Sequence, residues 1–176
     1  LGRYGESHRA YHNATHIADV LRWFDIVWDE VGWDSPADVY AAVLFHDAIY
    51  DPQRKDNEAR SADLAKEHGA SDYARLLIML TSKHGQLLPS DVDRDAANFL
   101  DCDTAILGAE PAQFDAYDIA IRREYAGIPD VDFARGRRAF LENLRARPRI
   151  FLGDLLHAKL DAAARDNLAR AIAKYT

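Results

Sequence analysis

The chain of 176 residues is 48% hydrophobic and 29% charged, a balance that supports one globular domain with a complete core over residues 1–176. Its formal net charge of −7 at pH 7 argues against nucleic-acid binding, which needs positive charge to displace the counterions of phosphate groups. The single cysteine, Cys102, excludes an internal disulfide, and no apolar run is long enough to span a membrane, so we expect a cytoplasmic protein without a membrane partner.

Nearly every segment has apolar residues at helical spacing, and Val and Ile are sparse, so we predict an all-α fold. The first helix is expected over residues 7–31, where the apolar residues form one stripe. Ser35 and Pro36 supply the cap and the first position of a second helix that ends near Tyr50. The sequence SDVD, which begins at Ser90, resembles a capping box at the start of another helix. Further helices are expected over residues 57–67, 71–84, 90–107, 112–126, 132–145, 150–159 and 161–175.

Four of these helices carry a histidine or a carboxylate where the apolar stripe would continue. The first stripe leads back to His16, the second leads on to His46 with Asp47 directly after it, and the helix over 90–107 presents Asp103. The stripe over 71–84 leads to His84. Burying such groups without partners costs several kcal/mol each. A shared metal ion compensates them, so we predict a metal centre formed by His16, His46, Asp47 and Asp103.

Asp101 and Asp103 compete for the role of the distant carboxylate ligand. Asp103 is in register with Leu100 and Leu107, whereas Asp101 shares a face with Ala97. We therefore favour Asp103 as the ligand, and interpret Asp101 either as a support of the cluster or as a solvated carboxylate. Two imidazoles and two carboxylates suit Mn, Fe, Co, Ni or Zn, and one carboxylate is able to bridge to a second, weaker ion such as Mg²⁺.

This residue set resembles the HD superfamily of metal-dependent phosphohydrolases, whose signature is a His, an adjacent His-Asp pair and a distant Asp on an all-helical domain. Here the matching residues are His16, His46, Asp47 and Asp103. The stretch YHNATHIADV also resembles the signature of the cyclic-nucleotide phosphodiesterases, a branch of that superfamily. There the first histidine protonates the leaving oxygen and the second binds metal. The resemblance therefore implies that His12 is the general acid.

Over nearly its full length the chain is most similar to a bacterial family of HD phosphohydrolases. The similar segments are HRAYHN, FHDAIYD, NEARSA, TSKH, FLDCDTAILGA, IRREY and ARDNL. The resemblance implies one HD-domain-like helical bundle that hydrolyses a phosphate mono- or diester of a small molecule, such as a nucleotide. Because this chain is far shorter than the phosphodiesterases and lacks a further histidine soon after its His-Asp pair, cyclic-nucleotide hydrolysis is not implied.

The predicted catalytic residues are His12, Asp47 and Glu58. The metal held in part by Asp47 would lower the pKa of a bound water toward ~7 and polarise a phosphoryl oxygen. His12 would donate a proton to the leaving oxygen. Glu58 would raise the pKa of His12, or would alternatively be an acid in the first turn of a helix, favoured there by the helix dipole.

Lys83, His84 and Arg122 are the predicted substrate-binding residues. His84 would grip the phosphate or bind a second metal, and its alternative is a cation at a helix C-terminus. Lys83, beside it, has equal weight as a phosphate ligand and as a surface residue. Arg122 would clamp phosphate through paired hydrogen bonds, or would pair with a carboxylate on the helix surface.

Three other functions stay open. A di-iron oxygenase on the same scaffold would need extra ligands such as His84. A non-catalytic module that binds metal or nucleotide would not need an acid at His12. A purely structural helical protein would bind no stoichiometric metal. The sequence is compatible with a monomer or a homodimer, and because it begins with Leu1 rather than methionine we expect residues ahead of it.

Overall fold

The structure, a computed structural model, describes residues 2–175, so the two ends of the predicted domain, Leu1 and Thr176, lie outside the described residues. These residues form α-helices and short 3-10 helices with no strand, which confirms the all-α prediction. In chain order the elements are η1 (Gly2–Gly5), α1 (Ala14–Glu30), α2 (Pro36–Phe45), α3 (Asn57–Glu67), α4 (Asp72–Thr81), η2 (Pro89–Asp91), α5 (Arg94–Thr104), η3 (Ala105–Gly108), α6 (Pro111–Glu124), α7 (Asp130–Ala146) and α8 (Asp154–Lys174).

Helix α1 begins at Ala14 and not at residue 7, which corrects the predicted boundary. The side-chain oxygen of Asn13 accepts hydrogen bonds from the backbone N–H groups of Thr15 (2.8 Å) and His16 (3.4 Å) and so caps the helix. His12 therefore lies in the irregular segment before the helix. The predicted helix over residues 7–31, which would contain both His12 and His16, is therefore wrong at its N-terminal end.

Helices α2 and α4 also end earlier than predicted. Because α2 ends at Phe45, His46 and Asp47 lie in the turn that follows it. Because α4 ends at Thr81, His84 likewise lies in a turn. Short turns after helices thus hold four of the predicted site residues, since Lys83 lies in the same turn as His84.

Two further boundaries differ from the prediction for reasons visible in the side chains. The cap of α5 is Asp93 rather than Ser90, since the Asp93 carboxylate accepts a hydrogen bond (2.8 Å) from a backbone N–H in the first turn. Helix α8 is continuous where we predicted two helices. Asp161 does not start a new helix there. Its carboxylate accepts a hydrogen bond from the N–H of Ile150 (2.8 Å) and pairs with Arg165 (2.6 Å).

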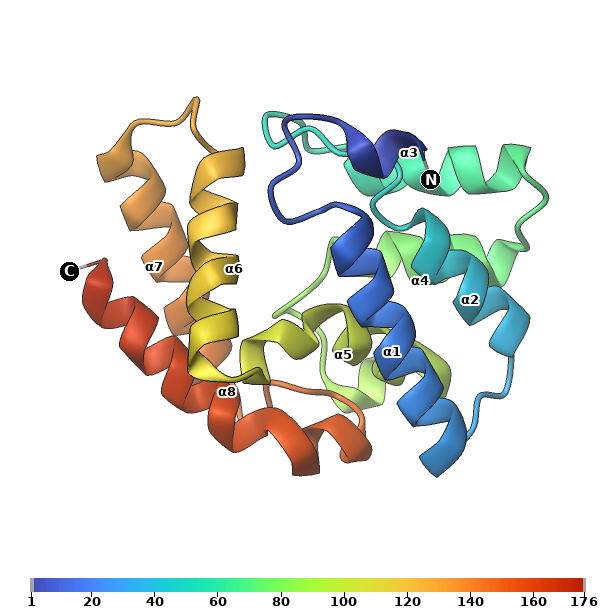
Figure 1. Cartoon of the computed structure of the whole chain (residues 1–176). Helices are drawn as coiled ribbons and strands as arrows, with labels where there is room; N and C mark the ends of the chain where they lie inside the picture. The colour runs from blue at the N-terminus through green and yellow to red at the C-terminus, as the bar shows by residue number, and fades with distance from the viewer. Residues whose placement is uncertain (1, 176) are drawn as a thin grey trace.

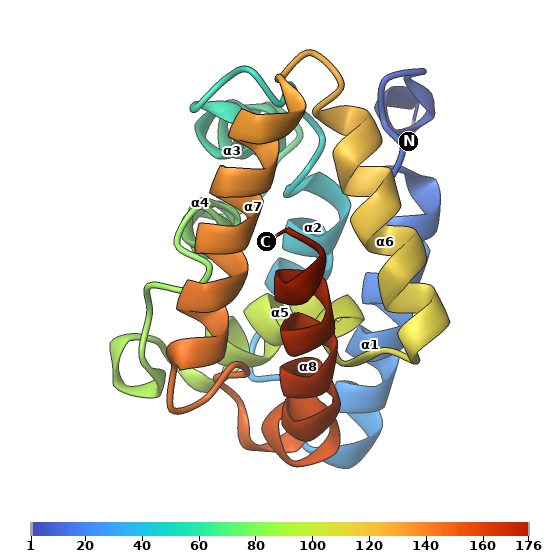
Figure 2. The ribbon, with the colours of Figure 1, turned by 90° about the vertical axis from the view of Figure 1, so that its left-hand side faces the viewer.

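The helices form two groups joined by η3 (Figure 1). Helices α1 to α5 pack against one another, and α8 packs against both α6 and α7. Helix α5 contacts α1, α2, α4 and α8, so it lies at the centre of the molecule, as the side view also shows (Figure 2). The largest fully buried apolar side chains are Phe99, Phe114, Phe151, Leu77, Ile78, Leu100, Leu141, Leu156 and Leu168. None of the described helices has the length and apolar character that a membrane crossing requires.

Candidate metal centre

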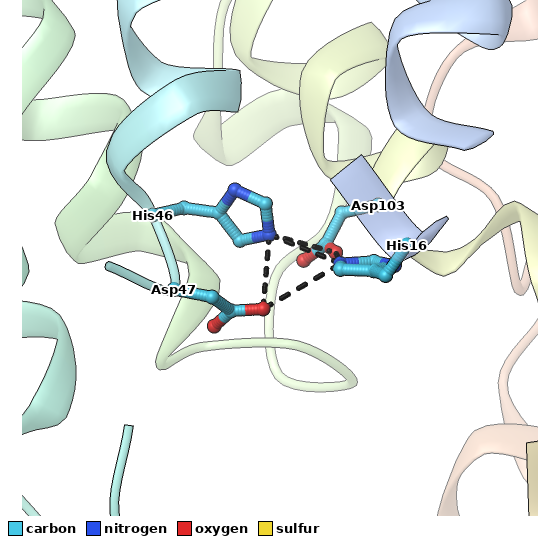
Figure 3. A group of neighbouring side chains, drawn as sticks. All are labelled: His16, His46, Asp47 and Asp103. Carbon is cyan, nitrogen blue, oxygen red and sulfur yellow. Dashed lines mark hydrogen bonds and ion pairs between the residues drawn. The ribbon is translucent and has the colours of Figure 1, made fainter. Parts of the chain in front are cut away.

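His16, His46, Asp47 and Asp103, called the His/Asp cluster below, meet at one point (Figure 3). They come from the first turn of α1, from the turn after α2 and from the last turn of α5. His16 Nε2 lies 3.2 Å from His46 Nε2 and 3.1 Å from Asp103 Oδ1. Asp47 Oδ2 lies 3.1 Å from His46 Nε2 and 3.5 Å from His16 Nε2. One ligand atom from each residue lies within 4.8 Å of all the others.

The spacing and chemistry of the His/Asp cluster fit a single divalent ion. Ligands about 2.0–2.2 Å from one ion lie about 2.8–3.6 Å from each other at tetrahedral or octahedral angles, and the distances above fall in that range. His46 Nδ1–H donates to the carbonyl of Val43 (3.0 Å), so the nitrogen that points into the cluster is Nε2. Two imidazole nitrogens with two carboxylate oxygens are a donor set for a transition metal. These four residues could therefore hold a metal ion.

The electrostatics of the His/Asp cluster also favour a cation. Burial would lower the pKa of His46, but the carboxylates of Asp47 and Asp103 hold it well above its ordinary value. Burial would raise the pKa of Asp103, but the charge of His46 and hydrogen bonds from the neighbouring imidazoles hold it well below the ordinary range. The pKa of Asp47 is lowered in the same way, with His46 again the main cause after burial. Both carboxylates are ionised at neutral pH.

His84 contacts the cluster through Asp103. Its Nε2–H donates to Asp103 Oδ2 (2.8 Å), while Asp103 Oδ1 faces the imidazoles of His16 and His46. The predicted site residue His84 therefore lies beside the His/Asp cluster, where it orients the carboxylate of Asp103. Its alternative as a mere helix-terminal cation does not describe this contact.

His12 lies beside the cluster, with its ring centroid 5.9 Å from that of His16. Its Nδ1–H donates to Glu124 Oε2 (2.6 Å), and its ring stacks on Tyr50 at 4.2 Å between centroids. The other oxygen, Glu124 Oε1, accepts hydrogen bonds from the backbone N–H groups of Tyr11 (2.7 Å) and His12 (2.9 Å). Tyr50 donates its hydroxyl to Glu124 Oε2 (2.8 Å). The position and tautomer of His12 are thereby fixed.

The carboxylate that contacts His12 is Glu124, so the prediction of Glu58 is corrected. Glu58 occupies the first turn of α3 and lines the same cavity as His12. The Glu124 side chain is fully buried. Burial would raise its pKa, but the hydrogen bond and charge of His12 lower it to about 2, so Glu124 is ionised at neutral pH. The sequence analysis missed Glu124, although extending the buried stripe of Phe114 and Ile121 along α6 leads to it.

Arg9 is a second residue that the sequence analysis missed. It is 5% exposed, and its guanidinium donates to the backbone carbonyls of His12 (3.0 Å), Asp47 (2.7 Å) and Ala48 (3.2 Å). These bonds tie the segment before α1 to the turn after α2. Arg9 therefore holds His12 in place relative to Asp47 of the His/Asp cluster.

A cavity of about 690 Å³, the larger cavity below, opens onto the cluster. The polar residues of the site that line it are His12, Asp47, His84 and Asp103. Its aromatic wall consists of Tyr50, Tyr117, Tyr125, Phe133 and Phe140. A volume of this size is typical of sites for small molecules.

Two predicted substrate-binding residues are not placed at this cavity. Lys83 is exposed and lies outside its lining. Arg122 donates to the carbonyls of Tyr125 (2.6 Å) and Ile128 (3.0 Å) and pairs with Asp130. The Arg122 guanidinium thus closes the loop between α6 and α7, which corrects its expected role as a phosphate clamp and agrees with the surface-pairing alternative.

Asp101 does not join the His/Asp cluster. It is 1% exposed, and its two carboxylate oxygens accept hydrogen bonds from the N–H groups of Leu152 (2.7 Å) and Gly153 (2.7 Å). It supports the loop before α8, so the alternative of a solvated carboxylate is wrong. Of the two candidates, the structure brings Asp103 to the cluster.

Comparisons of the chain with protein family models, with curated proteins and with solved structures found no match. The resemblance to the HD superfamily therefore depends on the residues and their order in this sequence. The structure itself shows an all-α fold with four residues that could hold a metal ion.

Proposed function

We propose that this chain is a metal-dependent phosphohydrolase of the HD superfamily that acts on a small phosphate ester. One observation supports the proposal above all. A cluster with the composition and spacing of a metal site lies beside a histidine–carboxylate pair, His12 and Glu124, at one cavity. A metal site alone would serve binding or structure, whereas an adjacent oriented imidazole adds a proton donor.

The residues divide the work as follows. His16, His46, Asp47 and Asp103 would hold a divalent transition metal. Such an ion, when bound, lowers the pKa of a water ligand toward ~7 and polarises a phosphoryl oxygen.

His12 would supply the proton for the leaving oxygen from Nε2, because Nδ1 is committed to Glu124. Glu124 stays ionised at neutral pH and accepts the Nδ1–H of His12, which leaves Nε2 as the nitrogen that faces the substrate. Tyr50 keeps both groups aligned, since its ring stacks on His12 and its hydroxyl donates to Glu124.

The central test compares the parent protein with Asp47→Ala after loading with Mn²⁺, Fe²⁺ or Zn²⁺. Metal content is measured by elemental analysis, and hydrolysis is screened with nucleotides, sugar phosphates and an aryl phosphate. We expect Asp47→Ala to lose both metal and turnover. Asp25→Ala, at an exposed carboxylate of α1, is the control and should keep both. Equal hydrolysis by Asp47→Ala and the parent would contradict the proposal.

The role of His12 is tested separately. His12→Ala should keep the metal and turn over ~10²–10⁴-fold more slowly. Loss of metal from His12→Ala would make this residue a ligand instead of an acid. The contact of His84 with Asp103 favours one alternative, the di-iron oxygenase. Two irons per chain and an oxygen-dependent spectrum in the purified protein would establish that alternative and overturn hydrolysis.

A further inference from the structure

A second cavity of about 610 Å³ reaches the His/Asp cluster from another side. It lies between α1, η3 and α6, whereas the larger cavity is lined by α3, α6 and α7 and by the turns after α2 and α4. His16 lines only the second cavity, and His12 and Asp47 line only the larger one. Asp103 and Tyr117 line both. The candidate metal centre therefore borders both cavities.

The wall of the second cavity suits an uncharged group. Trp23 and Ile106 provide apolar surface, and small side chains of η3 and α6 leave room beside them. The charged side chains of this wall, apart from Asp103, are Asp19, Glu110 and Arg22. Arg22 lies 3.9 Å from Asp19 and 5.2 Å above the Trp23 ring, so its charge is partly matched. The excess of carboxylates disfavours a second anionic group.

We propose that the substrate is a phosphodiester whose two substituents occupy the two cavities, with the phosphate at the cluster between them. This inference rests on the proposed phosphohydrolase function and narrows it. A monoester has one substituent and would use one cavity, whereas each cavity here has a volume typical of a site for a small molecule. A diester uses both.

The position of His12 sets the direction of cleavage. Because His12 lines the larger cavity, the alcohol that receives its proton is the one bound there. The bond between phosphorus and that alcohol's oxygen breaks, and a bond from phosphorus to a water oxygen forms. The proton that His12 gives up is replaced by one from the water, so the products are an alcohol in the larger cavity and a monoester whose uncharged group stays in the second cavity.

The experiment uses binding as well as turnover. Diphenyl phosphate and phenyl phosphate are titrated by calorimetry into the Zn²⁺-loaded protein, and hydrolysis is followed with bis(4-nitrophenyl) phosphate and 4-nitrophenyl phosphate. Ala116→Phe narrows the second cavity from an exposed position on α6. Ala112→Phe makes the same change one turn earlier on α6, at an exposed position outside the lining of either cavity, and serves as the matched control.

We expect Ala116→Phe to weaken diphenyl phosphate binding and diester hydrolysis by about tenfold or more, because added side-chain volume excludes one substituent. Ala116→Phe should change the binding of phenyl phosphate and the hydrolysis of 4-nitrophenyl phosphate by no more than about twofold. Ala112→Phe should change the binding and hydrolysis of all four esters by no more than about twofold. Equal losses for monoester and diester, or unchanged diester binding, would overturn the two-cavity proposal. If no ester is hydrolysed while Ala116→Phe still weakens diphenyl phosphate selectively, the hydrolase proposal fails and the two-cavity site stands.

Discussion

Two carboxylates on α5, Asp101 and Asp103, are separated in the chain by a single residue and have different environments. Both are withdrawn from solvent, yet Asp101 accepts two backbone N–H groups whereas Asp103 faces the side chains of three histidines. Burial raises the pKa of Asp101 to about 8, against the opposing effect of its two backbone hydrogen bonds. The pKa of Asp103 is lowered, because the charge of His46 and the imidazole hydrogen bonds outweigh burial.

The difference between the two shows what distinguishes a candidate metal ligand from a structural carboxylate. Backbone N–H groups at a loop are fixed partners, since releasing them leaves buried donors unsatisfied. An imidazole is able to lose its proton and then offer a lone pair to a cation. The carboxylate of Asp103, whose partners are imidazoles, is then also available to a cation. Burial alone does not separate the two roles. The identity of the partner does.

The largest effect is expected for metal binding by Asp103→Asn. The amide keeps the shape of the carboxylate and removes its charge, so the affinity for Mn²⁺ or Zn²⁺ should fall by more than about 100-fold. Calorimetric titration measures the affinity. Asp101→Asn, at the neighbouring site, should bind metal as the parent does. Comparable losses in the two variants would show that the comparison above is wrong.

The second effect concerns folding. Asp101→Ala leaves the N–H groups of Leu152 and Gly153 buried without acceptors, so the free energy of unfolding should fall by about 3 kcal/mol. Denaturant unfolding of the metal-free protein gives the value. The same variant should still gain stability when metal is added, because a ligand that binds only the folded state stabilises it. An Asp101→Ala protein as stable as the parent would mean that the loop before α8 does not depend on this carboxylate.

Local sequence patterns predicted the bounds of some helices to the residue and those of others only approximately. Helix α3 has the bounds that were predicted, 57–67. The predicted break in α8 is absent because Asp161, which resembles a helix start in the sequence, accepts a hydrogen bond from the N–H of Ile150 in the loop before the helix and pairs with Arg165 one turn later in the same helix. Tertiary contacts thus decide this boundary, and the sequence alone does not contain them.

Members of the His/Asp cluster could be predicted where the position of a residue in its own helix indicates which way its side chain points. Asp103 was preferred over Asp101 from the apolar stripe, and the structure brings Asp103 to the cluster. The solvated alternative for Asp101 failed because α5 is buried on all sides over residues 95–102. The pairing of His12 with Glu124 joins positions 112 residues apart, so no local spacing predicts it. Extending the stripe of α6 finds the carboxylate and leaves its partner unknown.

A smaller loss of stability is expected from Gly153→Ala. A Cβ atom there would lie 2.3 Å from Asn98 Oδ1 and 3.1 Å from Asp101 Oδ2, so both side chains would have to move. We expect the free energy of unfolding to fall by about 2 kcal/mol, with metal affinity unchanged. Gly136→Ala in α7 is the control, because a Cβ atom there would meet nothing within 4 Å. This substitution should stabilise the helix by about 1 kcal/mol. A metal-binding defect in Gly153→Ala would couple the two carboxylates that we treat as independent.

The smallest effect is a difference in pH dependence between the parent and Asp101→Asn. The pKa of Asp101 is about 8 in the folded protein and lies near its ordinary value of 3.8 in the unfolded chain, so the folded state binds this proton more tightly. The titration of Asp101 therefore lowers the free energy of unfolding as pH rises from 3.8 toward 8, by about 1 kcal/mol between pH 6 and pH 7. The variant lacks this contribution, so its free energy of unfolding should fall less steeply over the same interval. Parallel curves for the two proteins would mean that Asp101 is ionised throughout, with its two backbone hydrogen bonds outweighing the cost of burial.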